Sequence, residues 1–247
     1  ARIVGTDPKT DVAVLKIEAE GLPVLTLADS DRVRVGDIAF AVGNPLGVGQ
    51  TVTMGIVSAK GRSRLGLLER VSGYEDFIQT DAAINMGNSG GALVDARGRL
   101  IGINSAIITP SRGSVGIGFA IPVNLARFIM NSLVETGAVA RGFLGVTGGD
   151  ALAADLAEQL GLKRDARGVV VTEIEPGSPA DEAGLRRSDV VVALNGQTVS
   201  SWEELRLLVA QTLPGSEAKL RILRDGKPRA LVQMATGSGK TFTAISA

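Results

Sequence analysis

The sequence predicts a mainly β fold in its N-terminal half, followed by a mixed α/β domain. From residue 2 to about residue 121, short apolar stretches are separated by Gly, Asn, Asp and Pro, a pattern typical of a β-barrel or β-sandwich. From residue 142 onward, strand-like stretches alternate with helix-like ones. The composition, 45% hydrophobic and 21% charged, supplies ample apolar side chains for a core. We therefore expect one or two globular domains.

The N-terminal half contains six clear candidate strands. They span residues 12–17, 38–42, 51–59, 77–80, 91–94 and 100–107. Residues 95–98, Asp-Ala-Arg-Gly, suit a hairpin loop between the last two. The mixed segment 61–76 carries three arginines and is too long for a simple connection, so we expect a functional or mobile loop, with a solvated surface loop as the alternative.

Helices are expected where apolar residues recur at helical spacing or where capping residues occur. The first spans 124–135, with Asn124 as its N-cap and Gly137 as its C-cap, and a short linker at 138–141 follows it. In the second half, Asp150 is expected to cap a helix through residue 160, and residues 178–184 to form a short helix. Ser201 and Glu204, three residues apart, fit a capping box for a helix that extends to about residue 211.

The charge balance and four absences narrow the possible functions. The chain has 26 basic residues (Lys plus Arg) and 26 acidic residues (Asp plus Glu). This balance lacks the excess positive charge typical of nucleic-acid binding, and it favours a neutral partner such as a peptide. No apolar run approaches the ~20 residues of a membrane span, and no signal peptide opens the chain. The absence of cysteine excludes a thiol nucleophile. The absence of histidine removes the usual base of a serine protease.

The strongest candidate site is the turn at residues 81–91, Asp-Ala-Ala-Ile-Asn-Met-Gly-Asn-Ser-Gly-Gly. Glycine and asparagine tolerate positive φ, so the backbone can bend sharply around Ser89 and leave nearby N–H groups unpaired. The N–H groups of Gly87 and Ser89 would then stabilise an oxyanion formed when the Ser89 hydroxyl attacks a carbonyl. A plain β-turn is the alternative.

The sequences around this turn resemble the HtrA/Deg serine proteases. The resemblance rests on Phe-Ile-Gln-Thr-Asp-Ala-Ala-Ile-Asn at 77–85, Leu-Ile-Gly-Ile-Asn-Ser-Ala-Ile-Ile at 100–108 and Gly-Ile-Gly-Phe-Ala-Ile-Pro at 116–122. It implies a trypsin-like double β-barrel, with Asp11 and Ser89 as catalytic residues and Ile107 lining the substrate pocket. The family's catalytic histidine precedes its aspartate, so we expect a truncated chain whose N-terminal barrel is incomplete.

The second half resembles a PDZ domain of the permuted bacterial type. The resemblance assigns Phe143, Leu144, Gly145 and Val146 to the loop that binds a peptide C-terminus, with the peptide adding as a strand beside a helix from Trp202. The alternative is that these apolar residues belong only to the core.

The sequence departs from the family at its C-terminus. Residues 235–241, Ala-Thr-Gly-Ser-Gly-Lys-Thr, resemble the phosphate-binding loop of helicase-type ATPases, but the first glycine of the full pattern is replaced by Met234. We interpret this run as a foreign tail, with nucleotide binding as the alternative. The expected domains are therefore a protease domain at 1–139, a PDZ domain at 140–233 and a tail at 234–247.

The resemblance implies an HtrA/Deg-type serine endopeptidase that acts on unfolded or misfolded proteins in the periplasm, without a cofactor or metal. Because the chain has no histidine, we expect it to be inactive alone. The alternative is a non-catalytic, chaperone-like module that binds peptides. Exposed strand edges in an incomplete barrel predict a homo-oligomer.

Overall fold

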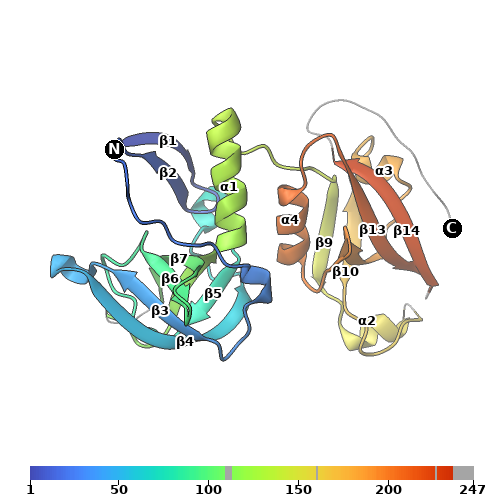
Figure 1. Cartoon of the computed structure of the whole chain (residues 1–247). Helices are drawn as coiled ribbons and strands as arrows, with labels where there is room; N and C mark the ends of the chain where they lie inside the picture. The colour runs from blue at the N-terminus through green and yellow to red at the C-terminus, as the bar shows by residue number, and fades with distance from the viewer. Residues whose placement is uncertain (109–112, 160, 226, 236–247) are drawn as a thin grey trace. The chain divides into compact units, whose positions relative to one another are not determined.

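The computed structural model describes residues 1–108, 113–159, 161–225 and 227–235 (Figure 1). The chain divides into two compact units, Ala1–Val139 and Ala140–Ala247. Most of the run predicted to resemble a phosphate-binding loop falls at 236–247 and lies outside the described residues.

The first unit contains a closed antiparallel barrel, which confirms the mainly β prediction for this half of the chain (Figure 1). Five of its strands agree with predicted ranges, whereas β8 was not expected. In order around the barrel, the strands are β3 (Ile38–Gly43), β4 (Thr51–Arg62), β5 (Phe77–Thr80), β8 (Gly118–Pro122), β7 (Leu100–Ile107) and β6 (Ala92–Asp95).

Small and branched apolar side chains fill the centre of this barrel. They include Ala39, Val57, Ile84 and Leu93, each no more than 1% exposed. Three short 3-10 helices lie in the connections outside the barrel, at Ser30–Arg32, Pro45–Gly47 and Glu69–Val71.

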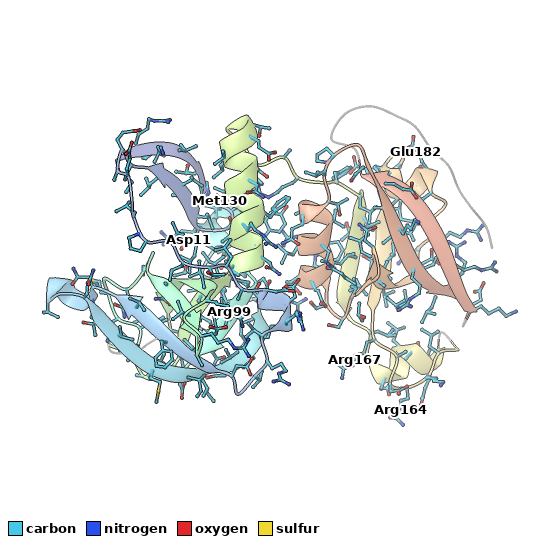
Figure 2. The ribbon with its side chains drawn as sticks, viewed as in Figure 1. Asp11, Arg99, Met130, Arg164, Arg167 and Glu182 are labelled. Atoms are coloured by element: carbon cyan, nitrogen blue, oxygen red, sulfur yellow. The ribbon has the colours of Figure 1, made fainter. Side chains whose placement is uncertain are left out.

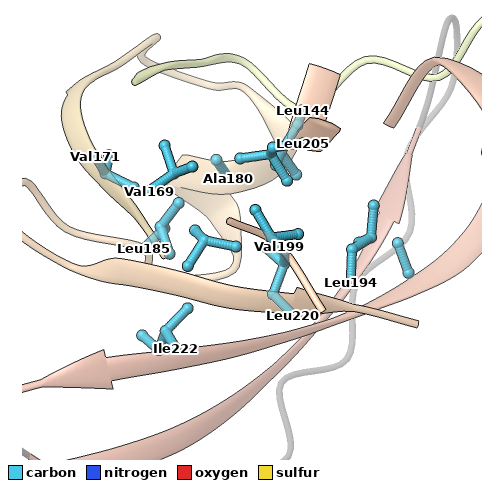
Figure 3. Close-up of a cluster of buried hydrophobic side chains, with 12 residues drawn as sticks. Leu144, Val169, Val171, Ala180, Leu185, Leu194, Val199, Leu205, Leu220 and Ile222 are labelled. Carbon is cyan, nitrogen blue, oxygen red and sulfur yellow. The ribbon is translucent and has the colours of Figure 1, made fainter. Parts of the chain in front are cut away.

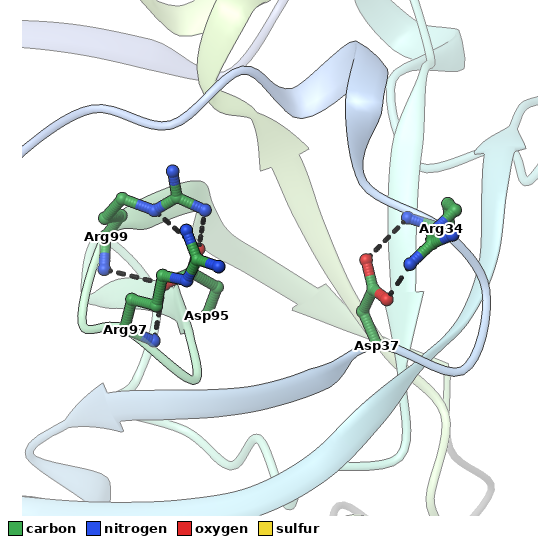
Figure 4. A network of polar contacts seen from close by, with 5 residues as sticks. All are labelled: Arg34, Asp37, Asp95, Arg97 and Arg99. Atoms are coloured by element: carbon green, nitrogen blue, oxygen red, sulfur yellow. Dashed lines mark hydrogen bonds and ion pairs between the residues drawn. The ribbon is translucent and has the colours of Figure 1, made fainter.

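The hairpin loop predicted at 95–98 is confirmed, and one carboxylate organises it (Figure 4). Asp95 accepts hydrogen bonds from the backbone N–H groups of Arg97 and Arg99, both at 2.9 Å, and from the Arg99 guanidinium at 2.8 Å. Partial burial raises the pKa of Asp95, but the hydrogen bonds from Arg99 and Arg97 and the charge of Arg99 outweigh it. The pKa of Asp95 therefore lies below its ordinary value.

The strands β1 (Arg2–Asp7) and β2 (Val12–Lys16) form a separate two-stranded sheet that packs against helix α1 (Val123–Thr136) (Figure 1). Gly5 permits this contact, because a β-carbon at this position would lie 2.9 Å from a methyl group of Leu133. Gly137 ends α1 in the left-handed conformation, as predicted. The predicted N-cap is wrong: Pro122 occupies that position, and the Asn124 amide instead donates to the Asp29 carboxylate at 2.8 Å.

The second unit is a six-stranded sheet with helices, which confirms the mixed α/β prediction (Figure 1). The strand β9 (Val146–Ala151) ends the strand order, so one of its edges is free of sheet partners within the described residues. The order continues inward from it through β10 (Val169–Ile174), β11 (Val190–Leu194), β13 (Ser216–Arg224) and β14 (Lys227–Ala235), with β12 (Gln197–Thr198) paired to β11.

The helices of the second unit are α2 (Ala154–Gln159), α3 (Pro179–Glu182) and α4 (Trp202–Gln211). The serines predicted to open α3 and α4 do so, because Ser178 and Ser201 each accept a hydrogen bond from a backbone N–H in the first turn. The predicted cap at Asp150 is wrong, since this residue lies within β9. Figure 3 shows the buried cluster of this unit, in which Leu144, Val169, Leu205 and Leu220 are at most 3% exposed.

Candidate active site

The turn that carries Ser89 connects β5 to β6 and has the bent backbone that its glycines predicted. Gly87 and Gly90 have φ values of +99° and +83°, which side-chain-bearing residues rarely adopt. The N–H of Asn88 donates to the Asn85 carbonyl at 2.9 Å, and the N–H of Gly91 donates to the Asn88 carbonyl at 2.9 Å. These hydrogen bonds project Ser89 from the turn with its side chain exposed.

The barrel holds this turn from two sides. The N–H of Gly90 donates to the Asn104 carbonyl of β7 at 2.8 Å, and the N–H of Asn104 donates to the Gly91 carbonyl at 2.9 Å. Gly91 also lies so close to β3 that a β-carbon there would overlap the Val42 carbonyl oxygen. The position of Ser89 is therefore fixed by backbone contacts to β3 and β7.

Two backbone N–H groups beside Ser89 are free to bind an anion. Within the described part of the chain, the N–H groups of Gly87 and Ser89 donate no hydrogen bond to the protein. The neighbouring side chain of Asn88 is turned inward, only 1% exposed, with its amide 3.4 Å from the Ala83 carbonyl. The turn thus carries two backbone N–H groups that have no protein acceptor among the described residues, and one exposed hydroxyl.

The structure brings Asp11 and Ser89 to the same residue, Ser105 of β7. The Ser89 hydroxyl donates to the Ser105 carbonyl at 2.8 Å. The Ser105 hydroxyl donates in turn to the Asp11 carboxylate at 2.7 Å. Ser105 was missed by the sequence reasoning; its signal is its place two residues before the predicted pocket residue Ile107.

The turn between β1 and β2 positions Asp11 (Figure 2). The Thr10 hydroxyl donates to the buried Asp7 carboxylate at 2.6 Å, and the Thr10 N–H donates to the Asp7 carbonyl at 3.1 Å. Asp11 follows with a φ of +58°, a conformation that aspartate tolerates better than most residues. Its carboxylate is exposed apart from the contact with Ser105.

Ile107 ends β7, two residues beyond Ser105. It is partly buried and packs against the barrel core that includes Ile84. Gly118 on the neighbouring strand makes room for Ile84, because a β-carbon at 118 would lie 2.9 Å from the Ile84 δ-carbon. Ile107 is therefore held in place by the barrel core.

The loop predicted to bind a peptide C-terminus precedes β9 in the second unit. Its carbonyls are used by the fold: Leu144 accepts from the N–H of Ala180 and Gly145 from the N–H of Glu175, both at 2.9 Å. Within the described residues, the N–H groups of Leu144 and Gly145 donate to no protein acceptor. Gly145 has a φ of +76°, and Phe143 is 44% exposed.

Apolar residues of this loop also belong to the core, as the alternative interpretation predicted. Leu144 is 3% exposed and lies in the same buried cluster as Leu205 of α4, while Val146 packs against that cluster (Figure 3). α4 contacts β9, with Trp202 so close to Gly148 that a β-carbon there would overlap the indole. The strand edge and the helix thus lie side by side, an arrangement that suits strand addition by a peptide.

The described residues contain neither a cluster of potential metal ligands nor a helix able to span a membrane. No group of three or more His, Cys, Asp or Glu side chains gathers there to hold a metal ion. None of the helices that the structure describes is long and apolar enough to cross a membrane.

Comparisons with known proteins cover almost the whole chain. A trypsin-like peptidase domain matches residues 1–103, and a PDZ domain matches residues 142–232. The chain is 48% identical to "Probable periplasmic serine endoprotease DegP-like" of Chlamydia trachomatis, over 97% of this chain and 48% of the relative. It is 50% identical to "Periplasmic pH-dependent serine endoprotease DegQ" of Escherichia coli, over 92% of this chain and 49% of the relative. The chain thus spans about half the length of these relatives.

Solved structures give the same result. The structure of "HtrA-type protease AlgW with tripeptide" matches with a TM-score of 0.77 and 50% identity, covering 97% of this chain and 78% of that one. A serine endoprotease from Yersinia pestis matches with a TM-score of 0.58 and 38% identity, covering 95% of this chain and 74% of that one. The chain belongs to the HtrA family of trypsin-type serine proteases that carry a PDZ domain.

Proposed function

We propose that these 247 residues form the aspartate- and serine-bearing part of an HtrA-type endopeptidase that cleaves unfolded or misfolded polypeptides. The observation that carries the proposal is the shared contact of Asp11 and Ser89 with Ser105. Two residues distant in sequence meet at one strand, next to two free backbone donors. An exposed serine hydroxyl, a nearby carboxylate and two backbone donors are groups that acyl transfer uses.

In the proposed reaction, the Ser89 oxygen attacks the scissile carbonyl and forms a tetrahedral adduct. The N–H groups of Gly87 and Ser89 stabilise the negative charge on the former carbonyl oxygen, a contribution of about 3 kcal/mol for one donor. The aliphatic surface at Ile107 favours a small or medium aliphatic side chain before the scissile bond. Asp11 orients and stabilises the base that accepts the Ser89 proton.

The base itself is not in this chain. All 247 residues lack histidine, and Asp11 is too weakly basic to replace an imidazole. Loss of the histidine from a comparable triad lowers turnover about a millionfold. We therefore propose that the chain alone does not hydrolyse peptides and that a histidine-bearing segment completes it.

A casein assay tests the first part of this proposal. The purified chain should release no fragments above background, and Ser89→Ala should behave identically. Ser132→Ala, which removes a hydroxyl from α1, is the matched control. Cleavage by the unchanged chain that Ser89→Ala abolishes and Ser132→Ala preserves would show that another group serves as the base.

The second unit is proposed to bind free C-termini of unfolded polypeptides. Support comes from the unused N–H groups of Leu144 and Gly145, the open edge of β9 and the adjacent α4. The peptide would add as a strand along β9, with its carboxylate at the loop. The absence of histidine favours, as a second candidate function, chaperone-like peptide binding without cleavage. Suppression of aggregation of an unfolded protein by Ser89→Ala would support that candidate.

We also propose that the protein forms a homo-oligomer and is located in the periplasm. The β1–β2 sheet has two strands, so each leaves an edge that the described chain does not pair, and Val52 and Met54 on β4 are 62% and 69% exposed. Such edges and apolar side chains favour a homo-oligomer. Sedimentation velocity should show a dimer or larger species, and a monomer at high concentration would contradict this. The relatives named periplasmic support a periplasmic location for this protein.

A further inference from the structure

The segment between β4 and β5 is organised by the carboxylate of Glu75. One oxygen of Glu75 accepts from the backbone N–H of Leu65 at 2.6 Å, and the other accepts from the N–H of Leu68 at 2.8 Å. The Leu68 carbonyl in turn accepts from the N–H of Gly73 at 3.0 Å. One partly buried side chain therefore folds both arms of the segment against each other.

The folded segment is attached to the turn that carries Asp11. The backbone N–H of Tyr74, the residue before Glu75, donates to the Lys9 carbonyl at 2.7 Å. Gly73 lies against the same carbonyl, because a β-carbon at this position would be 2.7 Å from the Lys9 oxygen. Lys9 stands two residues before Asp11, in the short connection between β1 and β2. Displacement of this segment would therefore move the Asp11 turn.

We propose that Glu75 is a positioning residue for Asp11, acting through the Tyr74 N–H and the Lys9 carbonyl. The Asp11 turn lies outside the closed barrel, and within it Lys9 and Asp11 are exposed while Asp7 and Thr10 are buried. Ser105 holds the Asp11 carboxylate from β7, and the Glu75-organised segment holds the backbone on the other side. The role of Asp11 rests on the proposed function, whereas the mechanical link between the segment and the turn does not.

Backbone NMR of the full chain tests this link without requiring catalysis. Glu75→Ala should speed amide hydrogen exchange at Tyr74 at least tenfold and shift the Thr10, Asp11 and Ser105 signals. Glu75→Gln keeps an amide oxygen that still accepts a hydrogen bond. Its exchange rate and signal positions should therefore lie between those of Glu75→Ala and those of the unchanged chain. Gly73→Ala should shift the same signals without removing the carboxylate, because its β-carbon would lie 2.7 Å from the Lys9 oxygen as well as 2.6 Å from the Leu68 β-carbon.

Asp95→Ala is the matched control, since Asp95 also accepts from two backbone N–H groups, in a hairpin loop. It should leave the Thr10 and Asp11 signals unchanged. The proposal is overturned if Glu75→Ala speeds hydrogen exchange only at the Leu65 and Leu68 amides, while the exchange rate of Tyr74 and the signal of Asp11 do not change. Equal shifts at Asp11 in Asp95→Ala would also overturn it, because a general loss of stability would then explain the effect. Failure of casein cleavage under all conditions would count against the proposed function but not against this link.

Discussion

The hydroxyl of Ser105 donates a 2.7 Å hydrogen bond to the carboxylate of Asp11. The carbonyl of the same residue accepts the hydroxyl of Ser89. Ser105 thus contacts both the proposed nucleophile and the proposed orienting carboxylate.

Ser105→Ala removes the hydroxyl but leaves the carbonyl that Ser89 contacts. A hydrogen bond to a charged group contributes about 1.5 kcal/mol, so we expect kcat to fall about tenfold in the enzyme completed by a histidine-bearing segment. KM should stay unchanged, because no substrate contact is lost. Steady-state kinetics on a peptide substrate would measure both. A change confined to KM would contradict the assigned role.

Gly91→Ala should abolish the folded serine turn. Its β-carbon would overlap the Val42 carbonyl oxygen and lie 2.8 Å from the Asn88 carbonyl oxygen, both of which are backbone atoms that cannot move away alone. We expect a loss of more than about 2 kcal/mol in the unfolding free energy of the first unit. Gly98→Ala, at a positive φ but with open space around it, should cost only about 1 kcal/mol. Urea unfolding followed by NMR signals of the first unit would compare the two, and equal losses would refute the steric argument.

Peptide binding to the second unit should require a free carboxylate. A peptide with an apolar C-terminal residue should bind at least tenfold more tightly than its amidated form, because in the proposed complex the Leu144 and Gly145 N–H groups donate to the terminal carboxylate. Gly145→Ala should abolish the difference, since Gly145 has a φ of +76° and contacts Ser178. Gly149→Ala, whose β-carbon would make an ordinary 3.5 Å contact, is the control. Calorimetry measures the affinities, and Trp202, the one tryptophan, provides a fluorescence signal. Equal affinity for both peptides would exclude carboxylate capture.

Asp95 should make the stability of the first unit depend on pH. Its pKa is lowered in the folded state by hydrogen bonds from Arg99 and Arg97, which outweigh the effect of burial. The charged form therefore stabilises the fold above the unfolded pKa of about 3.9, and this contribution is lost as the pH falls through the folded value. At pH 7, Asp95→Asn should lower the unfolding free energy by about 1.5 kcal/mol.

Below pH 4 this difference between Asp95→Asn and the unchanged chain should shrink toward zero. Glu135→Gln removes an exposed carboxylate at the end of α1 and should have little effect at either pH. Urea unfolding at pH 7 and pH 3 measures both variants. A difference for Asp95→Asn that grows as the pH falls would show that the sign is wrong.

The sequence predicted those features that depend on local backbone preferences. The bend around Ser89 follows from Gly87 and Gly90, and the hairpin at 95–98 follows from its loop residues. Two predicted caps were wrong for tertiary reasons: Asn124 bonds to Asp29 from a distant segment, and pairing with β10 draws Asp150 into a strand.

Contacts between distant segments could not be predicted in the same way. Ser105 gains its place in the site only because β7 passes between the Ser89 turn and the β1–β2 connection. Glu75 has no motif of its own, and its importance comes from backbone groups ten and seven residues earlier in the chain. Such roles depend on tertiary pairing, which spacing and composition do not encode.

The most direct test of the account is to supply the missing base. A histidine-bearing N-terminal segment from an HtrA-type relative would be purified separately and mixed with this chain, and casein fragments would be identified by mass spectrometry. We predict that the mixture cleaves after small or medium aliphatic residues, that Ser89→Ala abolishes cleavage and that Ser132→Ala does not, while neither component cleaves alone. Demonstrated binding of the segment without any Ser89-dependent cleavage would contradict the assignment of Asp11 and Ser89 to one active site.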